Sequence, residues 1–467
     1  MFLSIEQIPT DRFVAIQDDG VSLKYGELTK FSKEISKIVL SRSLVFSFCQ
    51  NDIGALAGYV AFLNGHIVPI LLNVQLDFEL LKYLLETYQP DYLWVPTKRK
   101  KDFCGECVYE RFGYCLIQYS YKKKKINENL ALLLTTSGST GSPKLVRQSY
   151  ENIESNAASI AEYLELDETE RPITMLPMNY TYGLSVINSH LLVGATILMT
   201  DASYAQRDFW DFFRKQEATS IVGVPYTYEV LKKLRFLRMD LPSLRYMTQA
   251  GGKLLPELHR EFAEYAENNG KRFYVMYGQT EATARMSYLP YKKSLEKYGS
   301  MGIAIPGGKF HLIDVDGTNV TLPHVTGELV YEGPNVTLGY AECLEDLAKG
   351  DERNGVLVTG DMAQFDEDGY YYIVGRKKRF LKIYGNRVNL DECERMIQGE
   401  FQDVECACTG VDDHMILYVT TSKNHDEMKK FLSEKTKLNS KAFEVRQISE
   451  IPKNDAGKKQ YRELERN

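Results

Sequence analysis

The chain has 467 residues, of which 44% are hydrophobic and 26% charged, so it can form about three folding units with large cores. A net charge of −6 argues against a general nucleic-acid binder, and no apolar run is long enough to cross a bilayer. The first ten residues lack the pattern of a signal peptide, so we expect a cytoplasmic protein. The single C-x-x-C, Cys104 to Cys107, has no second pair at metal-ligand spacing, which argues against a zinc site.

In the first 290 residues, short apolar runs alternate with segments of helical periodicity. The predicted strands include 13–16, 68–71, 221–225 and 273–276, and the predicted helices include 53–63, 153–164 and 228–237. This alternation is typical of βαβ units, so the sequence predicts a doubly wound α/β domain around a parallel sheet.

From about residue 290 to 375 the pattern changes to short strands separated by Gly, Pro and Asp-Gly turns, which predicts a barrel-like β segment. A basic stretch at 375–379 then marks a boundary, because so many charges cannot lie inside a core. We therefore predict a large N-terminal domain over 1–377 and a small, mobile C-terminal α/β domain over 378–467. The elements expected in the small domain are a helix with a capping box at Asn389 and Glu392, strands at 406–411, 415–420 and 443–448, and a helix near 427–435.

A polar loop follows an apolar run, 132–134, that is typical of a buried strand. The loop consists of Thr135, Thr136, Ser137, Gly138, Ser139, Thr140, Gly141, Ser142, Pro143 and Lys144. Glycine lets the backbone approach a phosphate, hydroxyls add neutral donors and lysine adds a cation, so the loop is predicted to bind a polyphosphate. It is not a Walker A loop, because proline precedes the lysine and the chain continues extended. A flexible polar surface connection is the alternative.

Five segments, taken together and in order, carry a family resemblance. They are the polar loop 135–144, Tyr277-Gly278-Gln279-Thr280-Glu281, Thr359-Gly360-Asp361, the segment from Gly375-Arg376 to Gly385, and the segment 452–458 that ends in Gly457-Lys458. The chain resembles the adenylate-forming, AMP-binding superfamily of acyl-CoA synthetases, stand-alone adenylation domains and luciferases, over nearly its whole length. The resemblance implies ATP and Mg²⁺ as cofactors. It also implies a reaction that joins a carboxylate to the α-phosphate of ATP, expels pyrophosphate and lets a nucleophile displace AMP.

The resemblance assigns roles to residues of the large domain. Glu281 would be the oxygen ligand of Mg²⁺, and Thr280 would donate a hydrogen bond to the α-phosphate. Tyr277 would lie on the adenine face, within the motif that also holds Gly278 and Gln279. Gly251 and Gly252 would flank the adenine, where a backbone without side chains can read the base edge. The ordinary alternatives are a solvent-facing acid, a core tyrosine and a tight turn.

Four further roles follow from the resemblance. Asp361 would accept hydrogen bonds from both ribose hydroxyls and Arg376 would contact the same sugar, although an aspartate after Thr-Gly can also cap a turn. Lys458 would reach between the carboxylate and the α-phosphate and neutralise developing charge, whereas an isolated lysine there would be a surface residue. Lys378 would be the pivot of the small domain, and an ordinary basic linker is the alternative.

The acid pocket is predicted from Tyr180, Tyr182, Gly183 and Lys253. Amino-acid-activating relatives place an aspartate where this chain has Gly183, so an α-ammonium would lack its partner here. Lys253 stands where relatives often have alanine, and we expect its stem to pack while the ammonium reaches water, in preference to pairing with a second acidic group. Two further departures, Leu145 for glycine and Gln148 for histidine, follow the polar loop.

The leading interpretation is an ATP-dependent, AMP-forming acid–thiol ligase that makes a thioester on coenzyme A or on the phosphopantetheine of a separate carrier protein. No carrier motif follows Lys458, so the thiol must come from outside. The alternatives are an amino-acid (D-alanine-like) carrier-protein ligase and an inactive nucleotide-binding or interaction protein.

Overall fold

The computed structural model describes residues 2–120, 124–135, 144–314, 316–384, 386–401, 404–422, 424–453 and 459–464. The chain forms two compact units. Unit 1 comprises Met1–Lys309 and Tyr331–Leu357, and unit 2 comprises Phe310–Val330 and Val358–Asn467. The chain passes from one unit to the other three times, so each unit is built from two separate segments of the sequence.

Unit 1 contains an eight-stranded sheet in the order β19-β9-β8-β4-β3-β5-β7-β6. Its strands are β3 (Leu44–Cys49), β4 (Val68–Asn73), β5 (Tyr92–Pro96), β6 (Glu106–Arg111), β7 (Tyr114–Gln118), β8 (Leu130–Thr135), β9 (Leu145–Ser149) and β19 (Gly339–Ala341). β3 pairs parallel with β4 and β5, and β4 with β8, whereas β8–β9, β9–β19, β5–β7 and β6–β7 are antiparallel. The expected parallel sheet is thus a mixed one, because the short connections to β7 and β9 cannot form the crossover that parallel pairing needs.

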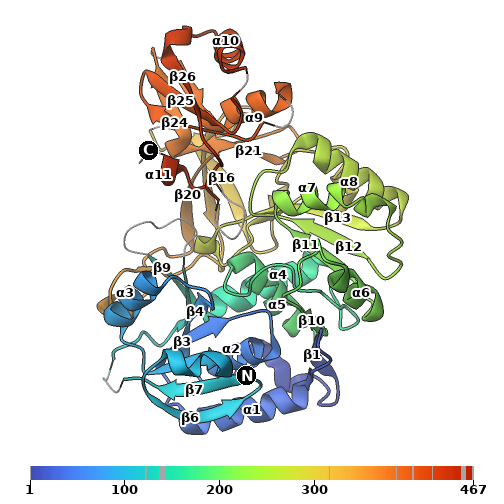
Figure 1. Ribbon diagram of the computed structural model, residues 1–467, viewed down its shortest axis with the longest axis vertical. Coiled ribbons are helices and arrows are strands. Elements are labelled where there is room, and N and C mark those ends of the chain that lie inside the picture. The colour runs from blue at the N-terminus through green and yellow to red at the C-terminus, as the bar shows by residue number, and fades with distance from the viewer. Residues whose placement is uncertain are drawn as a thin grey trace. The chain divides into compact units, whose positions relative to one another are not determined.

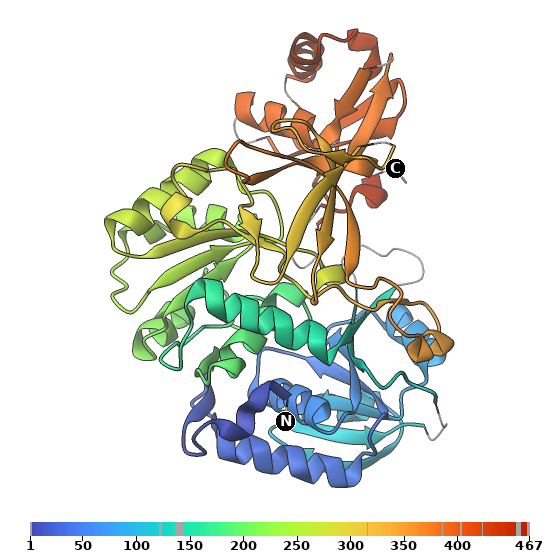
Figure 2. The same ribbon diagram turned by 180° about the vertical axis from the view of Figure 1, so that it is seen from behind.

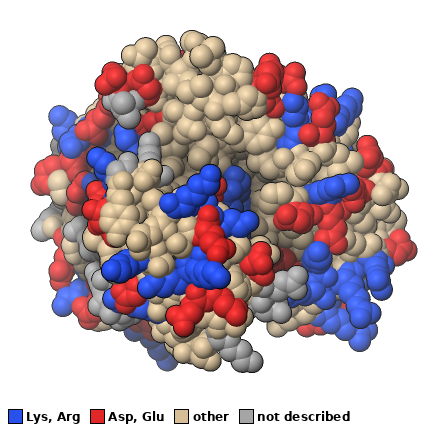
Figure 3. Space-filling view, turned by 90° about the horizontal axis from the view of Figure 1, so that it is seen from above, with Lys and Arg blue, Asp and Glu red and all other residues tan. Residues whose placement is uncertain are grey.

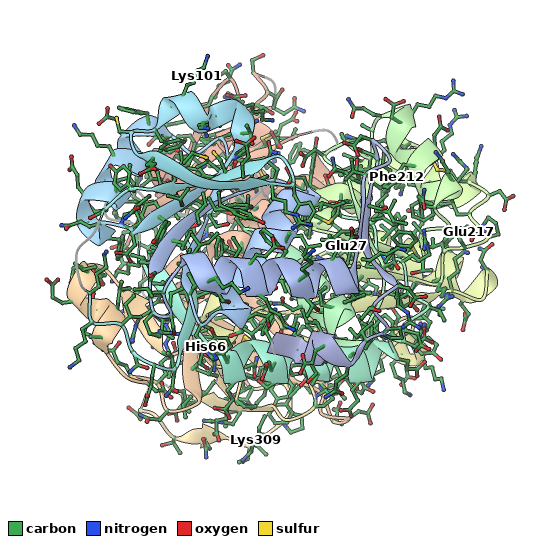
Figure 4. All side chains as sticks on the ribbon, turned by 90° about the horizontal axis from the view of Figure 1, so that it is seen from below. Glu27, His66, Lys101, Phe212, Glu217 and Lys309 are labelled. Atoms are coloured by element: carbon green, nitrogen blue, oxygen red, sulfur yellow. The ribbon has the colours of Figure 1, made fainter. Side chains whose placement is uncertain are left out.

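Three helices, α1 (Tyr25–Ile38), α2 (Ile53–Asn64) and α3 (Phe78–Tyr88), belong to this region. Every residue of α2 from Ile53 to Leu63 is buried, because α2 contacts both α1 and the strands β3 and β4. The mainly apolar sequence of α2 suits a helix that is covered on all sides. Figure 4 shows α1 across the outside of this region, with Glu27 in its first turn, where its carboxylate accepts a hydrogen bond from the Lys24 N–H.

A second sheet of unit 1 has the order β11-β12-β13-β14-β15. Its strands are β11 (Ser220–Gly223), β12 (Tyr246–Gln249), β13 (Arg272–Tyr277), β14 (Ser287–Tyr288) and β15 (Ile303–Ala304), and the helices α6 (Arg207–Lys215), α7 (Pro225–Lys233) and α8 (Pro256–Asn268) alternate with them. β11, β12 and β13 are parallel, so their carboxyl ends lie at one edge. Ligands bind at such an edge in open α/β sheets, and the predicted motif residues Gly251 and Gly278 follow β12 and β13 there.

The helices α4 (Tyr150–Leu164) and α5 (Thr181–Leu192) lie between the two large sheets of unit 1 (Figures 1 and 2). A small third sheet joins β10 (Ile197–Met199), β1 (Phe13–Gln17) and β2 (Ser22–Lys24). Helix α5 is hydrogen-bonded to α2 and to β12. Asn188 accepts a hydrogen bond from Tyr59 of α2 at 2.8 Å, and the Tyr182 hydroxyl donates to the Thr248 carbonyl of β12. The predicted acid-pocket segment is therefore anchored to both sides of unit 1.

The predicted β segment forms a five-stranded sheet in the order β17-β16-β18-β20-β21. The strands are β16 (Lys309–Ile313), β17 (Asn319–Val320), β18 (Gly327–Glu332), β20 (Val356–Phe365) and β21 (Tyr371–Arg376). The rest of unit 2 contains the hairpin β22 (Phe380–Ile383) and β23 (Asn386–Asn389), helices α9 (Leu390–Glu400), α10 (His425–Thr436) and α11 (Tyr461–Leu464), and the sheet β24 (Cys406–Val411), β25 (His414–Val419) and β26 (Phe443–Gln447). Large α/β and small C-terminal α/β regions are thus both present, as the sequence predicts.

The α9 start is fixed by Asn389, whose side-chain oxygen accepts hydrogen bonds from the N–H groups of Asp391 and Glu392. Its amide nitrogen donates to the Val374 carbonyl at 2.8 Å, and a Cβ on Gly375 would lie 2.7 Å from it. Glycine is therefore needed where this cap packs against β21.

Charges are mixed on the face shown in Figure 3, where Lys and Arg side chains lie among Asp and Glu side chains. Such a mixture differs from the single-sign stripe typical of nucleic-acid binding. In the part of the chain that the structure describes, no helix combines the length and apolarity that a membrane span requires.

Candidate active site

Strand β13 ends in the loop that carries Glu281. The chain turns at Gly278 and Gln279 into a 3-10 helix, Thr280–Ala282. A Cβ on Gly278 would lie 1.6 Å from the Ala284 carbonyl oxygen, so only glycine allows this loop to close. Thr283 and Ala284 adopt φ values of 52° and 96°, which are unfavourable for residues with a side chain. Such strain is characteristic of functional loops.

Glu281 is held by residues that lie 56 to 72 positions later in the chain. The Tyr340 hydroxyl donates to its Oε1 at 2.7 Å, and Arg353 donates to its backbone carbonyl at 3.0 Å and to the Thr337 hydroxyl at 2.6 Å. Burial and the Glu281 charge raise the pKa of Tyr340 to about 12, so this phenol stays a donor at neutral pH. No described residue hydrogen-bonds Oε2 of Glu281, which leaves that oxygen for a ligand.

Two cations flank the ring of Tyr340. Arg353 Cζ lies 4.7 Å and Lys144 Nζ 5.6 Å from the ring centroid, and Lys144 also forms a 2.6 Å ion pair with Glu342. We call Glu281, Tyr340, Arg353 and Lys144 the Glu281 cluster. This arrangement suits a magnesium polyphosphate, because the carboxylate oxygen can bind the metal ion and the two cations can pair with phosphate oxygens.

Two ends of the polar loop are described. Thr135 ends β8 and Lys144, which is exposed, precedes β9, and Thr135 pairs with Leu145 across the two antiparallel strands. The predicted buried strand before the loop and the extended chain after it are both confirmed. Residues 136–143 of the loop lie outside the described residues. The roles of Thr136, Ser137, Gly138, Ser139, Thr140 and Gly141 therefore stay predictions.

The predicted adenine-flanking residues lie at the ends of β12 and β13. Gly251 has φ 85°, and a Cβ there would lie 2.7 Å from the Tyr180 hydroxyl, so glycine is required. The Gly252 carbonyl accepts a hydrogen bond from the Gln249 side chain at 2.9 Å. The half-buried Tyr277 accepts from the Gln279 side chain at 3.1 Å.

The predicted acid-pocket residues differ in their surroundings. Lys253 is exposed, whereas Tyr182 is 3% exposed and its hydroxyl lies 2.8 Å from that of Thr248. A Cβ on Gly183 would lie 2.4 Å from the Pro177 carbonyl oxygen, so this backbone excludes an aspartate at that position for packing reasons alone. Tyr180 lies edge-on to Tyr182, with centroids 6.4 Å apart.

In unit 2, the structure brings the two predicted ribose residues together. Asp361 and Arg376 are direct partners in the antiparallel pair β20–β21, and their side chains form a 3.2 Å ion pair. The Asp361 side chain is 5% exposed and that of Arg376 is 66% exposed, so one partner is fixed and the other reaches solvent. The backbone N–H of Asp361 also donates a hydrogen bond to the Thr359 hydroxyl oxygen at 3.1 Å.

The predicted pivot, Lys378, is among the described residues, and the predicted catalytic lysine is not. Lys378 lies in a 3-10 helix, Lys377–Arg379, and Lys458 lies outside the described residues. Lys453 and Lys459, the described residues before and after it, form an antiparallel bridge. The buried carboxylate of Glu394 pairs with Lys459 at 2.6 Å and with Arg379 at 2.5 Å. Glu394 thus links the residue after the pivot to the residue after the predicted catalytic lysine.

The sequence did not point to Tyr340, Arg353 or Glu394. Tyr340 and Arg353 lie far along the chain from Glu281, and no local pattern marks them.

The profile of the AMP-binding enzyme family matches residues 4–341. The chain belongs to this family. Over 294 residues it is 30% identical to a 2-succinylbenzoate–CoA ligase of Geobacillus sp. (strain WCH70), covering 61% of this chain and 56% of that protein. It is 32% identical over 283 residues to an indoleacetate–CoA ligase of Aromatoleum aromaticum, covering 60% and 54%. The matches therefore span little more than half the length of these relatives.

The fold of this AMP-binding family member matches solved structures over its whole length. An O-succinylbenzoate coenzyme A synthetase from Bacillus subtilis, solved in complex with AMP, superposes with a TM-score of 0.81 at 22% identity, covering 99% of this chain and 97% of that one. At this identity the likeness establishes the fold, an α/β architecture with a large N-terminal and a small C-terminal domain.

Proposed function

We propose that this protein is an AMP-forming acid–thiol ligase. The observation that carries the proposal is the Glu281 cluster, in which a carboxylate and two cations lie around Tyr340 beside the end of the polar loop. Positive charge is needed there because the reaction brings two anions, a carboxylate and a triphosphate, into contact.

ATP and Mg²⁺ fit the residues that are present. Oε2 of Glu281 supplies the single carboxylate ligand that a phosphate-bound Mg²⁺ commonly takes, and the bound ion would neutralise phosphate charge. Lys144, Thr280 and the polar loop would hold the phosphates, and Asp361 with Arg376 would hold the ribose. Lys458 would neutralise the charge that develops between carboxylate and α-phosphate.

The acid is proposed to be an acyl or aryl acid. Both curated relatives named above join a carboxylic acid to coenzyme A, and coenzyme A or a carrier protein is the acceptor we propose here. Gly183 offers no counter-charge, and a desolvated α-ammonium without one is costly, so α-amino acids should be poor substrates. Strong activity with D- or L-alanine would instead support the amino-acid carrier ligase.

We also retain the proposals of a domain boundary at residue 378, a pivot at Lys378 and a cytoplasmic location. The boundary is supported by the small core beyond it, which comprises among others Ile383, Ile397, Cys408, Leu417 and Phe443.

The test is pyrophosphate release from Mg-ATP across a panel of carboxylic acids, first without thiol and then with coenzyme A or carrier protein. The proposal predicts acid-dependent release and, with one thiol, a thioester. Nucleotide binding without release for any acid would favour the inactive nucleotide-binding protein.

A further inference from the structure

Arg147, in the middle of β9, is a buried cation that contacts a segment 191 to 205 residues later in the chain. Its exposed fraction is 0%, and hydrogen bonds occupy all five N–H donors of its guanidinium. Nε donates to the Tyr340 carbonyl at 3.0 Å, Nη1 to the carbonyls of Lys349 and Gly350 at 2.6 and 3.1 Å, and Nη2 to the Leu338 carbonyl at 2.9 Å and the Glu352 carboxylate at 2.5 Å. These acceptors are therefore held in one arrangement.

The acceptors lie beside the two residues that hold Glu281. Tyr340 accepts from Arg147 with its backbone carbonyl, while its side-chain hydroxyl donates to Oε1 of Glu281. Glu352, which pairs with Arg147, directly precedes Arg353, and Arg353 donates to the Glu281 carbonyl. One guanidinium thus fixes both positions of the chain from which Glu281 is held.

Gly339 leaves room for the buried ion pair. It has φ 122°, and a Cβ there would lie 2.6 Å from Oε2 of Glu352 and 2.9 Å from Nη2 of Arg147. The backbone adds two further bonds, from the Leu338 N–H to the Arg147 carbonyl at 2.9 Å and from the Glu352 N–H to the Leu338 carbonyl at 3.0 Å. Backbone and side chains therefore join β9, β19 and the residues before Arg353 into one unit.

Stability alone does not explain a guanidinium at this position. A buried ion pair is often no more stabilising than apolar side chains of similar volume. A fully hydrogen-bonded polar network does, however, restrict the surrounding chain to a single geometry. In this network that geometry sets where Tyr340 and Arg353 meet Glu281.

We infer that Arg147 is a positioning residue for the binding of magnesium polyphosphate. Because it is fully buried, it acts through Tyr340 and Arg353, which orient the Glu281 carboxylate. The inference rests on the proposed function and adds to it a residue outside the Glu281 cluster on which the geometry of that cluster depends.

The experiment measures the Kd of Mg-ATP by calorimetry and the KM of the acid by pyrophosphate release, with the full chain as wild type, Arg147→Met and Arg147→Lys. Arg147→Met should weaken Mg-ATP binding about tenfold or more and leave the KM of the acid unchanged. Arg147→Lys should recover part of the binding, because an ammonium can pair with Glu352 but lacks the planar fork that reaches the carbonyls. A KM of the acid that rises as much as the Kd of Mg-ATP would indicate a general loss of packing and would overturn the inference.

A double variant tests the route by which Arg147 acts. Arg147→Met already releases Arg353, so Arg147→Met combined with Arg353→Met should bind Mg-ATP no more weakly than Arg147→Met alone. Losses that multiply in the double variant would contradict this route. Arg171→Met is the control: Arg171 also belongs to unit 1, but its guanidinium donates to Gln216, and its loss should leave Mg-ATP binding unchanged.

Glu352→Gln keeps the inference testable if Arg147→Met does not fold. The Glu352 side chain is 46% exposed, so this variant should fold, and it should weaken Mg-ATP binding by a smaller factor than Arg147→Met. Wild-type binding in a folded Arg147→Met variant, or in Glu352→Gln where Arg147→Met does not fold, would overturn the inference and leave the ligase function intact. Absence of both Mg-ATP binding and acid-dependent pyrophosphate release in wild type would instead reject the proposed function itself.

Discussion

At the residue scale, the chemistry depends on which atoms remain available after the fold has used the others. Glu281 gives one carboxylate oxygen to Tyr340 and keeps the other open among the described residues. The predicted ribose residue Asp361 is buried and fixed, whereas its partner Arg376 is largely exposed. The sequence motifs alone do not show which of these side-chain atoms remain available.

Glu281→Gln tests the metal role. Removing the negative charge should weaken Mg²⁺-dependent pyrophosphate exchange at least tenfold and raise the Mg²⁺ concentration needed for half-maximal rate. Tyr340→Phe is the matched control, because it removes the hydrogen bond to Oε1 and keeps the charge. An unchanged Mg²⁺ requirement in Glu281→Gln would remove Glu281 from the metal site.

At the scale of elements, the sequence predicted those helices and strands that have a local pattern of apolar residues. The apolar face of α4 and the strands that bracket the polar loop follow directly from periodicity. It could not predict that β9 returns antiparallel beside β8, because strand partners depend on long-range packing. For the same reason it missed Tyr340 and Arg353.

Glycine at position 183 illustrates a second limit. Amino-acid-activating relatives have an aspartate at this position, so the glycine indicates a pocket without a partner for an α-ammonium. The nearby Pro177 carbonyl, however, leaves no room for any side chain here. Packing and substrate choice thus give the same residue two explanations. The packing explanation depends on the contact with Pro177, which the sequence does not show.

Glu394→Gln tests the connection between the proposed pivot and the predicted catalytic lysine. Glu394 is buried and pairs with both Arg379 and Lys459, so loss of its charge should destabilise the protein by about 3 kcal/mol. Adenylation should fall more than thioester formation from supplied acyl-adenylate, since Lys459 adjoins Lys458. The measurements are urea unfolding and the two half-reactions.

Glu434→Gln is the control for that variant. Glu434 forms an exposed ion pair with Lys430 on α10, so its loss should cost less than about 0.5 kcal/mol. Equal destabilisation by the two substitutions would contradict a special role of Glu394.

At the scale of the whole molecule, acid stability is expected to depend on two buried histidines. Burial lowers the pKa of both His190 and His259 to about 4. The unfolded chain binds these protons near pH 6.5, so the free energy of unfolding should fall as the pH drops from 6.5 to 4. Each histidine should contribute about 3 kcal/mol over this interval, with no further change below it.

Urea unfolding at pH 7 and pH 5 measures this effect. His190→Gln should reduce the difference between the two midpoints, whereas the exposed His66→Asn should not (Figure 4). Equal pH dependence in wild type and His190→Gln would show that His190 does not titrate in this way.

Lys378→Pro tests the proposed pivot. Proline restricts its own φ and the residue before it, so the variant should lose thiol transfer more than adenylation. Lys378→Ala, which leaves the backbone free, should retain both half-reactions. Wild-type rates for both steps in a folded Lys378→Pro variant would place the pivot elsewhere.

The central claim is that the chain activates a carboxylic acid as an adenylate. Isotope exchange between pyrophosphate and ATP tests it most directly, because exchange requires reversible adenylation and needs no thiol. The account predicts exchange that depends on both Mg²⁺ and an acid and that falls by orders of magnitude in Lys458→Ala. Absence of exchange with every acid, or an equal rate in Lys458→Ala, would contradict it.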